Sequence, residues 1–153
     1  MSDSTFSAPD LTRRPPRSMR VRLGHYAILP RILDKCRAAL AGTLGEYKYA
    51  CPLDQHFFRF TGVDPERLKA EVAKGLGDGA VLAWIEAHAP AHRQPWEIIQ
   101  WSDYQERRGP DSDPETLGYF VDGVRRLGGN REDLRTWADY LDLDDHVSFG
   151  GKP

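Results

Sequence analysis

The chain has 153 residues, of which 40% are hydrophobic and 29% are charged, and its formal net charge is −2 at pH 7. This length and composition are typical of one folded domain and exclude a disordered chain. The balanced charge excludes a general attraction to nucleic acid or to an anionic membrane surface. No apolar run approaches the ~18 residues of a membrane-spanning helix, and the first residues show no secretory signal, so we expect a soluble cytoplasmic protein.

Residues 1–28 are predicted to form an extended, arginine-rich arm that packs on the domain. The sequence "RRPPRS" contains two consecutive prolines, which lack backbone donors and hold the residue before each of them out of the helical region. Five arginines and no acid lie between positions 13 and 22, whereas positions 111–146 hold ten acids and four arginines. The arm either covers the acidic part of its own domain, which we favour because the net charge nearly cancels, or binds an external polyanion.

The rest of the chain, residues 29–153, is predicted to be a single helical domain. Capping aspartates followed by proline recur along it, at Asp64 and at Asp113, and glycines such as Gly75 and Gly128 follow as helix stops. No long alternating β-branched run is present. The pattern predicts an all-α fold, a compact bundle of about six to seven short helices. The expected helices lie within 29–42, 52–62, 64–75, 77–90, 94–110, 112–129 and 130–142.

Two halves of this helical region resemble each other weakly. The corresponding positions are Pro52 and Pro95, Asp64 and Asp113, and Trp84 and Trp137. The pattern fits two related three-helix units joined in one chain. Capping residues also recur in unrelated helices, so a bundle without duplication is the alternative, which we slightly favour.

The stretch "GEYKYACPLDQHFF", residues 45–58, concentrates polar and reactive side chains. If Pro52 occupies the first helical position, Cys51 is the N-cap and Asp54 lies in the first turn, where a carboxylate stabilises the helix dipole. Free N–H groups at a helix start favour a thiolate, which makes Cys51 a candidate nucleophile. The carboxylate of Asp54 opposes that thiolate, and we favour an inert Cys51. Cys36 lies on the apolar stripe of the first helix and is expected in the core.

Common cofactor and metal motifs are missing from the sequence. It contains no GxxxxGK[ST] phosphate loop, no GxGxxG after a strand and no HExxH. His88 and His92 are four residues apart, but Pro90 lies between them and prevents a shared helix face. The acidic run "DLDDH", residues 142–146, lacks the glycine and terminal glutamate of a calcium loop and is interpreted as a solvated helix end. We therefore expect no cofactor and no metal.

Our leading hypothesis is a cofactor-independent enzyme, a lyase, hydrolase or isomerase, that acts on a small aromatic or anionic molecule. The segments "HYAILPRILDK" and "EYKYACPLDQH" carry polar and aromatic side chains that could face each other across one helix. Tyr47 and Tyr49 either form a wall of a pocket or, as we favour, pack on the neighbouring helix. Acid–base catalysis requires groups with a tunable pKa. The expected catalytic residues are Asp34, Asp54 and His56. The expected substrate-binding residues are Arg20, Arg22, His25, Tyr26, Lys35, Tyr47 and Tyr49.

The alternative hypothesis is a non-catalytic binding module whose arginine arm docks on nucleic acid or on an acidic protein. Stacking on bases requires aromatic residues interleaved with the arginines, whereas the four tryptophans lie at helix-core spacing. We therefore expect a small-molecule ligand rather than nucleic acid, and no membrane contact. The sequence predicts no oligomeric state.

Several stretches carry a resemblance to a known family. These are "DLTRRPPRS", "RVRLGHYAILPRILDKCRAALAGTLGEYKY", "CPLDQHFFRFTGVDPE" and "LDLDDHVSFGG". Together they resemble the small bacterial proteins grouped as the domain of unknown function DUF5069, over nearly the whole chain. The resemblance implies that "GEYKYACPLDQHFF" is a family signature rather than a chance linker. It implies no reaction, ligand or partner, and no functional residue is carried over from it.

Overall fold

The computed structural model describes residues 7–111, 113–129 and 131–153, and this part of the chain contains seven helices and one short hairpin. The helices are α1 (Leu29–Ala41), α2 (Asp54–Thr61), α3 (Pro65–Val72), α4 (Asp78–His88), α5 (Pro95–Arg107), α6 (Pro114–Gly128) and α7 (Trp137–Ser148). The hairpin strands are β1 (Arg22–Leu23) and β2 (Tyr26–Ala27). The prediction of an all-α fold with six to seven short helices is confirmed.

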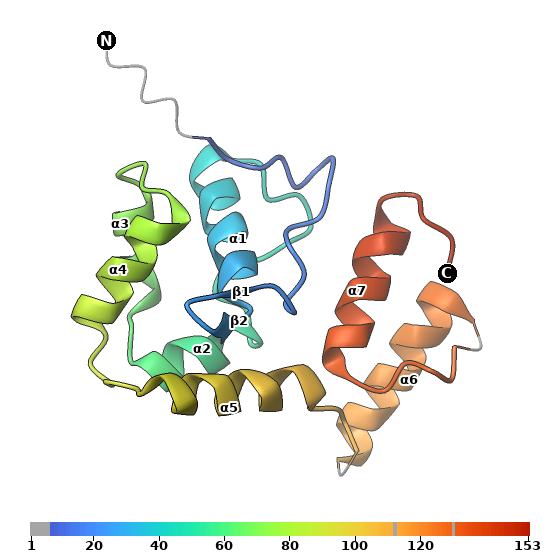
Figure 1. The fold of residues 1–153 in the computed structure, drawn as a ribbon. Coiled ribbons are helices and arrows are strands. Elements are labelled where there is room, and N and C mark those ends of the chain that lie inside the picture. The colour runs from blue at the N-terminus through green and yellow to red at the C-terminus, as the bar shows by residue number, and fades with distance from the viewer. Residues whose placement is uncertain (1–6, 112, 130) are drawn as a thin grey trace.

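The helices are arranged around α1. This helix lies near the centre of the molecule, with α3 and α4 on one side and the α6–α7 pair on the other (Figure 1). The long helix α5 runs across one end of the molecule and links the two sides. Strand β2 packs on α5, so the hairpin is held between α1 and α5.

The hydrophobic core forms around the apolar face of α1. Leu29, Ile32, Leu33 and Cys36 are all fully buried and follow the three- and four-residue spacing of one helix face. Burial raises the pKa of the Cys36 thiol to about 11, so the thiol stays protonated. The core is completed by buried residues of α2, α3 and α4, namely Phe57, Phe58, Leu68, Val72, Val81 and Ile85.

The predicted arm, residues 1–28, contains a hairpin that the sequence analysis did not foresee. Leu23 pairs with Tyr26 across a turn formed by Gly24 and His25, whose φ angles are 56° and 69°. Positive φ at both central residues is typical of the type I′ turn that closes two-residue hairpins. A Cβ atom on Gly24 would lie 2.6 Å from the side chain of Leu82, so a larger residue here would strain the turn and displace that side chain.

The capping aspartates at two helix starts are confirmed. Asp64 accepts a hydrogen bond from the Arg67 backbone N–H at 3.0 Å, and Asp113 accepts one from Glu115 at 3.2 Å. In both cases proline follows directly, as the sequence predicts.

Two helix starts were predicted wrongly. Helix α2 begins at Asp54 with Leu53 in the N-cap position, so Cys51 and Pro52 precede the helix and Cys51 is not its cap. Helix α7 begins at Trp137 rather than near position 130, which itself lies outside the described residues. Thr136 and Asp139 form a reciprocal capping box there, and these paired bonds fix the start of the helix.

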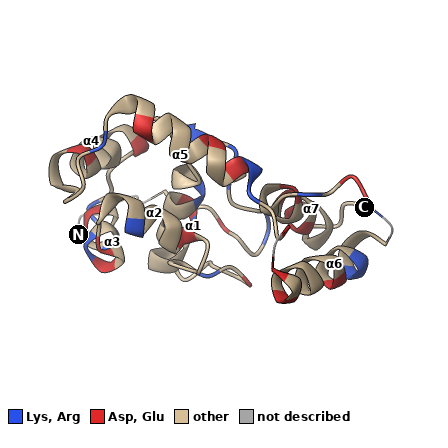
Figure 2. Ribbon diagram, turned by 90° about the horizontal axis from the view of Figure 1, so that it is seen from below, with Lys and Arg blue, Asp and Glu red and all other residues tan. Residues whose placement is uncertain are grey.

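Three arginines of the arm pair with carboxylates of the helices. The ion pairs join Arg17 to Asp34 and Asp78, Arg20 to Asp139 and Asp142, and Arg22 to Asp103 and Glu106. Arg20 pairs with acids within positions 111–146, the acidic part of the chain noted in the sequence, whereas Arg17 and Arg22 pair with acids outside that range. The structure therefore shows the intramolecular alternative for Arg20, whereas Arg17 and Arg22 are paired within the chain but with other acids. Figure 2 shows acidic and basic positions interspersed over the helices.

The buried hydroxyl of Ser102 on α5 joins the hairpin to that helix through two hydrogen bonds. Its Oγ accepts from the Ala27 N–H at 2.9 Å and donates to the His25 carbonyl at 2.6 Å.

We predict that Ser102→Ala lowers the free energy of unfolding by about 1–3 kcal/mol, because two backbone groups lose their partner. Urea denaturation should show a lower midpoint with an unchanged slope. Ser148→Ala, which removes an exposed hydroxyl bonded to Asp144, is the control, and an equal effect of both variants would contradict the prediction.

Candidate functional site

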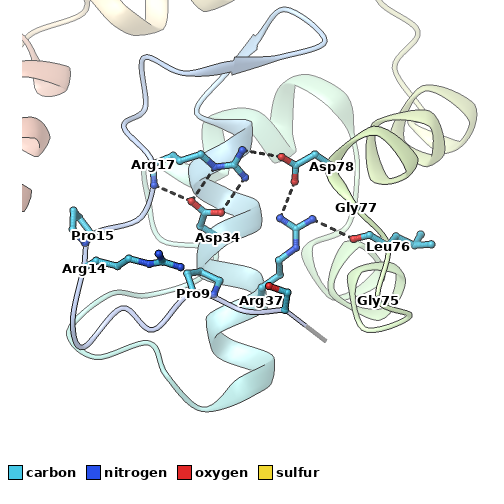
Figure 3. Close-up of a pocket in the computed structure, with 11 residues that line it drawn as sticks. Pro9, Arg14, Pro15, Arg17, Asp34, Arg37, Gly75, Leu76, Gly77 and Asp78 are labelled. Atoms are coloured by element: carbon cyan, nitrogen blue, oxygen red, sulfur yellow. Dashed lines mark hydrogen bonds and ion pairs between the residues drawn. The ribbon is translucent and has the colours of Figure 1, made fainter. Parts of the chain in front are cut away.

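A cavity of about 590 Å³ lies between the arm, α1 and the loop that joins α3 to α4. This volume is within the range of small-molecule sites. Its walls come from three separate parts of the chain, which Figure 3 shows converging on one space. The polar side chains that line it are Ser7, Arg14, Arg17, Asp34, Arg37 and Asp78.

A network of ion pairs forms one wall of this cavity. The guanidinium of Arg17 lies between Asp34, at 3.0 Å, and Asp78, at 2.8 Å. Arg37 binds the other oxygen of Asp78 at 2.7 Å and donates to the Leu76 carbonyl at 3.2 Å (Figure 3). Burial acts to raise the pKa of Asp78, but the hydrogen bonds from the two arginines outweigh it and hold that pKa below its ordinary value. Asp78 therefore keeps its negative charge, and the two arginines hold its position.

The N-terminus of α4 forms another wall. Its N-cap is Gly77, which has no side chain, and the carboxylate of Asp78 is bound by arginines instead of capping the helix. The loop before it turns at Gly75, whose φ is +83°. A Cβ atom at Gly77 or at Gly79 would meet no atom of the described residues within 4 Å, so there is open space beside the glycines on either side of Asp78. The first backbone N–H groups of a helix attract anions.

Arg14 enters the cavity from the arm. Its side chain is exposed and makes no hydrogen bond or ion pair with any residue in the described ranges, in contrast to Arg17 and Arg37. In Figure 3 it extends from the arm toward the same space without a dashed contact. The three arginines outnumber the two aspartates in the lining, which leaves one positive charge in surplus. The cavity can therefore bind a small anion.

The predicted site residues Lys35 and Asp54 meet away from this cavity. Lys35 Nζ lies 2.7 Å from Asp54 Oδ2, and the two side chains are only 4% and 0% exposed. The ammonium also lies 3.5 Å from Cys51 Sγ, and Asp54 Oδ2 accepts the Cys51 backbone N–H at 3.3 Å. Asp54 Oδ1 accepts no hydrogen bond from the described residues. The arrangement is a buried ion pair that ties α1 to the start of α2.

A second buried ion pair was missed by the sequence analysis. Arg31 binds Asp145 through two contacts, at 2.8 Å and 3.2 Å, and Tyr47 donates to the same carboxylate at 2.7 Å. Burial and this bond raise the pKa of the Tyr47 hydroxyl. Asp145 belongs to the run interpreted as a solvated helix end, but it is only 7% exposed, so that interpretation is wrong for this residue. The position of Arg31, four residues before Lys35, was the available signal for a shared polar face.

The predicted aromatic residues do not form a common wall. Tyr47 stacks on Phe149, whereas Tyr49 donates its hydroxyl to the Pro65 carbonyl at 2.7 Å and packs on Phe58. Tyr26 is 4% exposed and lies in the core, with Phe57, Phe60 and Trp101 around it. Desolvation raises the pKa values of Tyr26 and Tyr49.

The remaining predicted residues are also dispersed. His25 lies exposed in the hairpin turn, and Arg20 and Arg22 are occupied by carboxylates of α7 and α5. His56 is half-buried on α2, where burial and then the charges of Arg108 and Arg59 lower its pKa. The arm cavity is lined by Asp34 of "HYAILPRILDK" and by no residue of "EYKYACPLDQH", so Asp34 is the predicted catalytic residue that lies in it.

No group of three or more histidine, cysteine, aspartate or glutamate side chains suited to a metal ion occurs in the described ranges. In the same ranges, no helix combines the length and apolar character of a membrane span.

The family model described as a domain of unknown function, DUF5069, matches residues 13–147. The chain belongs to the DUF5069 family. The resemblance stated from the sequence is thereby confirmed. A search of curated proteins found no match. The match spans the arm arginines, both buried ion pairs and all residues that line the arm cavity except Ser7 and Pro9.

Breaking the Lys35–Asp54 pair should destabilise the protein strongly. We predict that Asp54→Ala lowers the free energy of unfolding by about 3–5 kcal/mol, because the Lys35 ammonium is left buried without its carboxylate. The double variant Lys35→Met with Asp54→Leu should be less destabilised than either single change. Glu71→Ala, which removes an exposed pair with Lys74, is the control and should cost less than about 1 kcal/mol in urea denaturation. A wild-type midpoint for Asp54→Ala would contradict the prediction.

The lowered pKa of His56 predicts a loss of stability in mild acid. The unfolded chain binds the His56 proton below about pH 6.5, whereas the folded protein keeps the ring neutral to lower pH. The unfolded state then binds more protons, so the free energy of unfolding falls as pH decreases from about 6.5 toward the folded pKa. His56→Gln should remove part of this dependence in urea midpoints measured across that range. His92→Gln, at an exposed position, should keep it, and equal behaviour of the two variants would exclude His56 as the source.

Proposed function

We propose that this DUF5069 protein binds a small molecule that carries a phosphate or carboxylate group, in the cavity between the arm, α1 and the α3–α4 loop. The observation that carries the proposal is Arg14, an arginine without an ion-pair partner among the described residues that lines a ligand-sized cavity. Arginine binds phosphate and carboxylate oxygens through paired, charge-assisted hydrogen bonds. The exposed N-terminus of α4 adds backbone donors in the same cavity.

The other two arginines of the cavity fix the positions of its walls. Arg17 and Arg37 are engaged by Asp34, Asp78 and the Leu76 carbonyl, which fixes the positions of the arm, α1 and the α4 N-terminus. A site whose walls are already fixed loses little entropy on binding. The ligand therefore needs to satisfy only Arg14 and the helix N–H groups.

This geometry supports binding better than the predicted lyase, hydrolase or isomerase chemistry. Asp34, the predicted catalytic residue in the cavity, accepts hydrogen bonds from Arg17 on both oxygens. A general base must lie within hydrogen-bond reach of the proton that it takes, and here the Arg17 guanidinium lies against both carboxylate oxygens. Catalysis stays a prediction that would require the ligand to displace Arg17. The proposal places the protein in the cytoplasm, where Cys36 and Cys51, both free thiols, would stay reduced.

The proposal is tested by titrating the protein with pyrophosphate and with citrate in low-salt buffer. We expect one of these anions to bind and to raise the melting temperature by several degrees at saturation, since a ligand at 100 times its Kd adds about 2.7 kcal/mol. Arg14→Ala should weaken that binding about tenfold to a hundredfold, because a charge-assisted bond is lost. Calorimetric titration measures the change in Kd.

The matched control is Arg13→Ala, which removes the same charge one residue earlier. Arg13 has a side chain that is 86% exposed, and it is not among the residues that line the cavity. Both variants should keep the wild-type melting temperature without ligand. Failure of both anions to bind, or an equal loss of affinity in the two variants, would overturn the proposal.

A further inference from the structure

A second cavity lies at the other end of the molecule, between the end of α5, helix α6 and the segment that leads into α7. Its volume is about 850 Å³, also within the range of ligand sites. It shares no lining residue with the arm cavity, so it is a separate site.

The apolar part of the lining of this second cavity, called the floor below, is a stripe of α6. Leu117, Phe120, Val121 and Val124 line it and follow the spacing of one helix face. Phe120 and Val124 are buried, and Phe120 packs edge-on against Trp137 with ring centroids 5.2 Å apart. In contrast, Leu117 and Val121 are 44% and 36% exposed. The stripe therefore continues past its contact with α7 and presents apolar surface to the cavity.

The cationic part of the lining, called the rim below, consists of arginines. Arg107, Arg125, Arg131 and Arg135 line the cavity together with two acids, which leaves two positive charges in surplus. Arg131 is paired with Asp133, at 2.8 Å. The side chains of Arg125 and Arg135 are exposed and make no ion pair or hydrogen bond within residues 7–111, 113–129 and 131–153.

We propose that this cavity binds an amphiphilic monocarboxylate, a molecule with an unbranched aliphatic tail and one carboxylate head. The tail covers Leu117 and Val121 and removes their exposed apolar surface from water. The head pairs with Arg125 or Arg135, whose planar guanidinium groups match a carboxylate. An apolar floor with a cationic rim favours such a ligand over two others. A purely polar anion would leave the apolar floor exposed to water, and a cationic amphiphile would be repelled by the rim.

The experiment is a calorimetric titration of the whole protein with hexanoate, octanoate and decanoate below their micelle concentrations. We expect saturable binding whose Kd tightens about fourfold for each added methylene, the factor that corresponds to about 0.8 kcal/mol per buried methylene. Decylammonium, with the same tail length and the opposite charge, should not bind. Pyrophosphate should not displace decanoate, since the arm cavity is separate.

Two pairs of variants assign the site. Arg125→Ala and Arg135→Ala should together weaken decanoate binding at least about tenfold, whereas Arg126→Ala, at an exposed arginine outside the lining, should not. Leu117→Ser should flatten the dependence on chain length, whereas Tyr119→Ser, at a 61% exposed position outside the lining, should keep it. Absence of decanoate binding, equal binding of decylammonium, or equal effects of the paired variants would overturn the proposal.

Discussion

The charged face of α1 sets the positions of the elements around it. Its charged side chains each pair with a different part of the chain: Arg31 with Asp145 of α7, Asp34 with Arg17 of the arm, Lys35 with Asp54 of α2, and Arg37 with Asp78 of α4. Taking charges out of water offsets most of the attraction within such pairs, so they add little net stability. Breaking one is costly, however, because it leaves an uncompensated charge. The pairs therefore restrict how the four elements can be arranged, while the apolar face of α1 supplies the free energy of burial.

This arrangement explains which features could be predicted from the sequence. The helix starts at Asp64 and Asp113 depend on hydrogen bonds within three residues, so their signal is local. The apolar stripe of α1 is likewise a periodic signal within one helix. The pairing of Arg31 with Asp145 joins residues 114 positions apart, and nothing near either residue in the sequence identifies its partner. Asp145 therefore resembles a solvated carboxylate until the fold brings α7 against α1.

The candidate site was difficult to predict for the same physical reason. Lys35, Asp54 and Tyr47 were selected because polar and aromatic residues gather in two segments, and these residues do form contacts, but with partners that bury them. In the sequence, nothing distinguishes Arg14 from the other arginines of the arm. What distinguishes it is that Arg17, Arg20 and Arg22 find carboxylates. That difference depends on tertiary contacts and has no counterpart in composition or spacing.

The net charge of the chain and the charge of each cavity lining have different consequences for binding. A chain with a formal charge of −2 has no overall attraction for polyanions, and the pairing of three arm arginines with acids is consistent with that balance. Each cavity nevertheless has more arginines than acids in its lining. At physiological salt an exposed charge acts over about 8 Å, so a ligand in a cavity experiences the lining rather than the whole molecule. A nearly neutral DUF5069 chain can therefore have two cavities with a surplus of arginine: one beside the N-terminus of α4, and one with an apolar floor on α6.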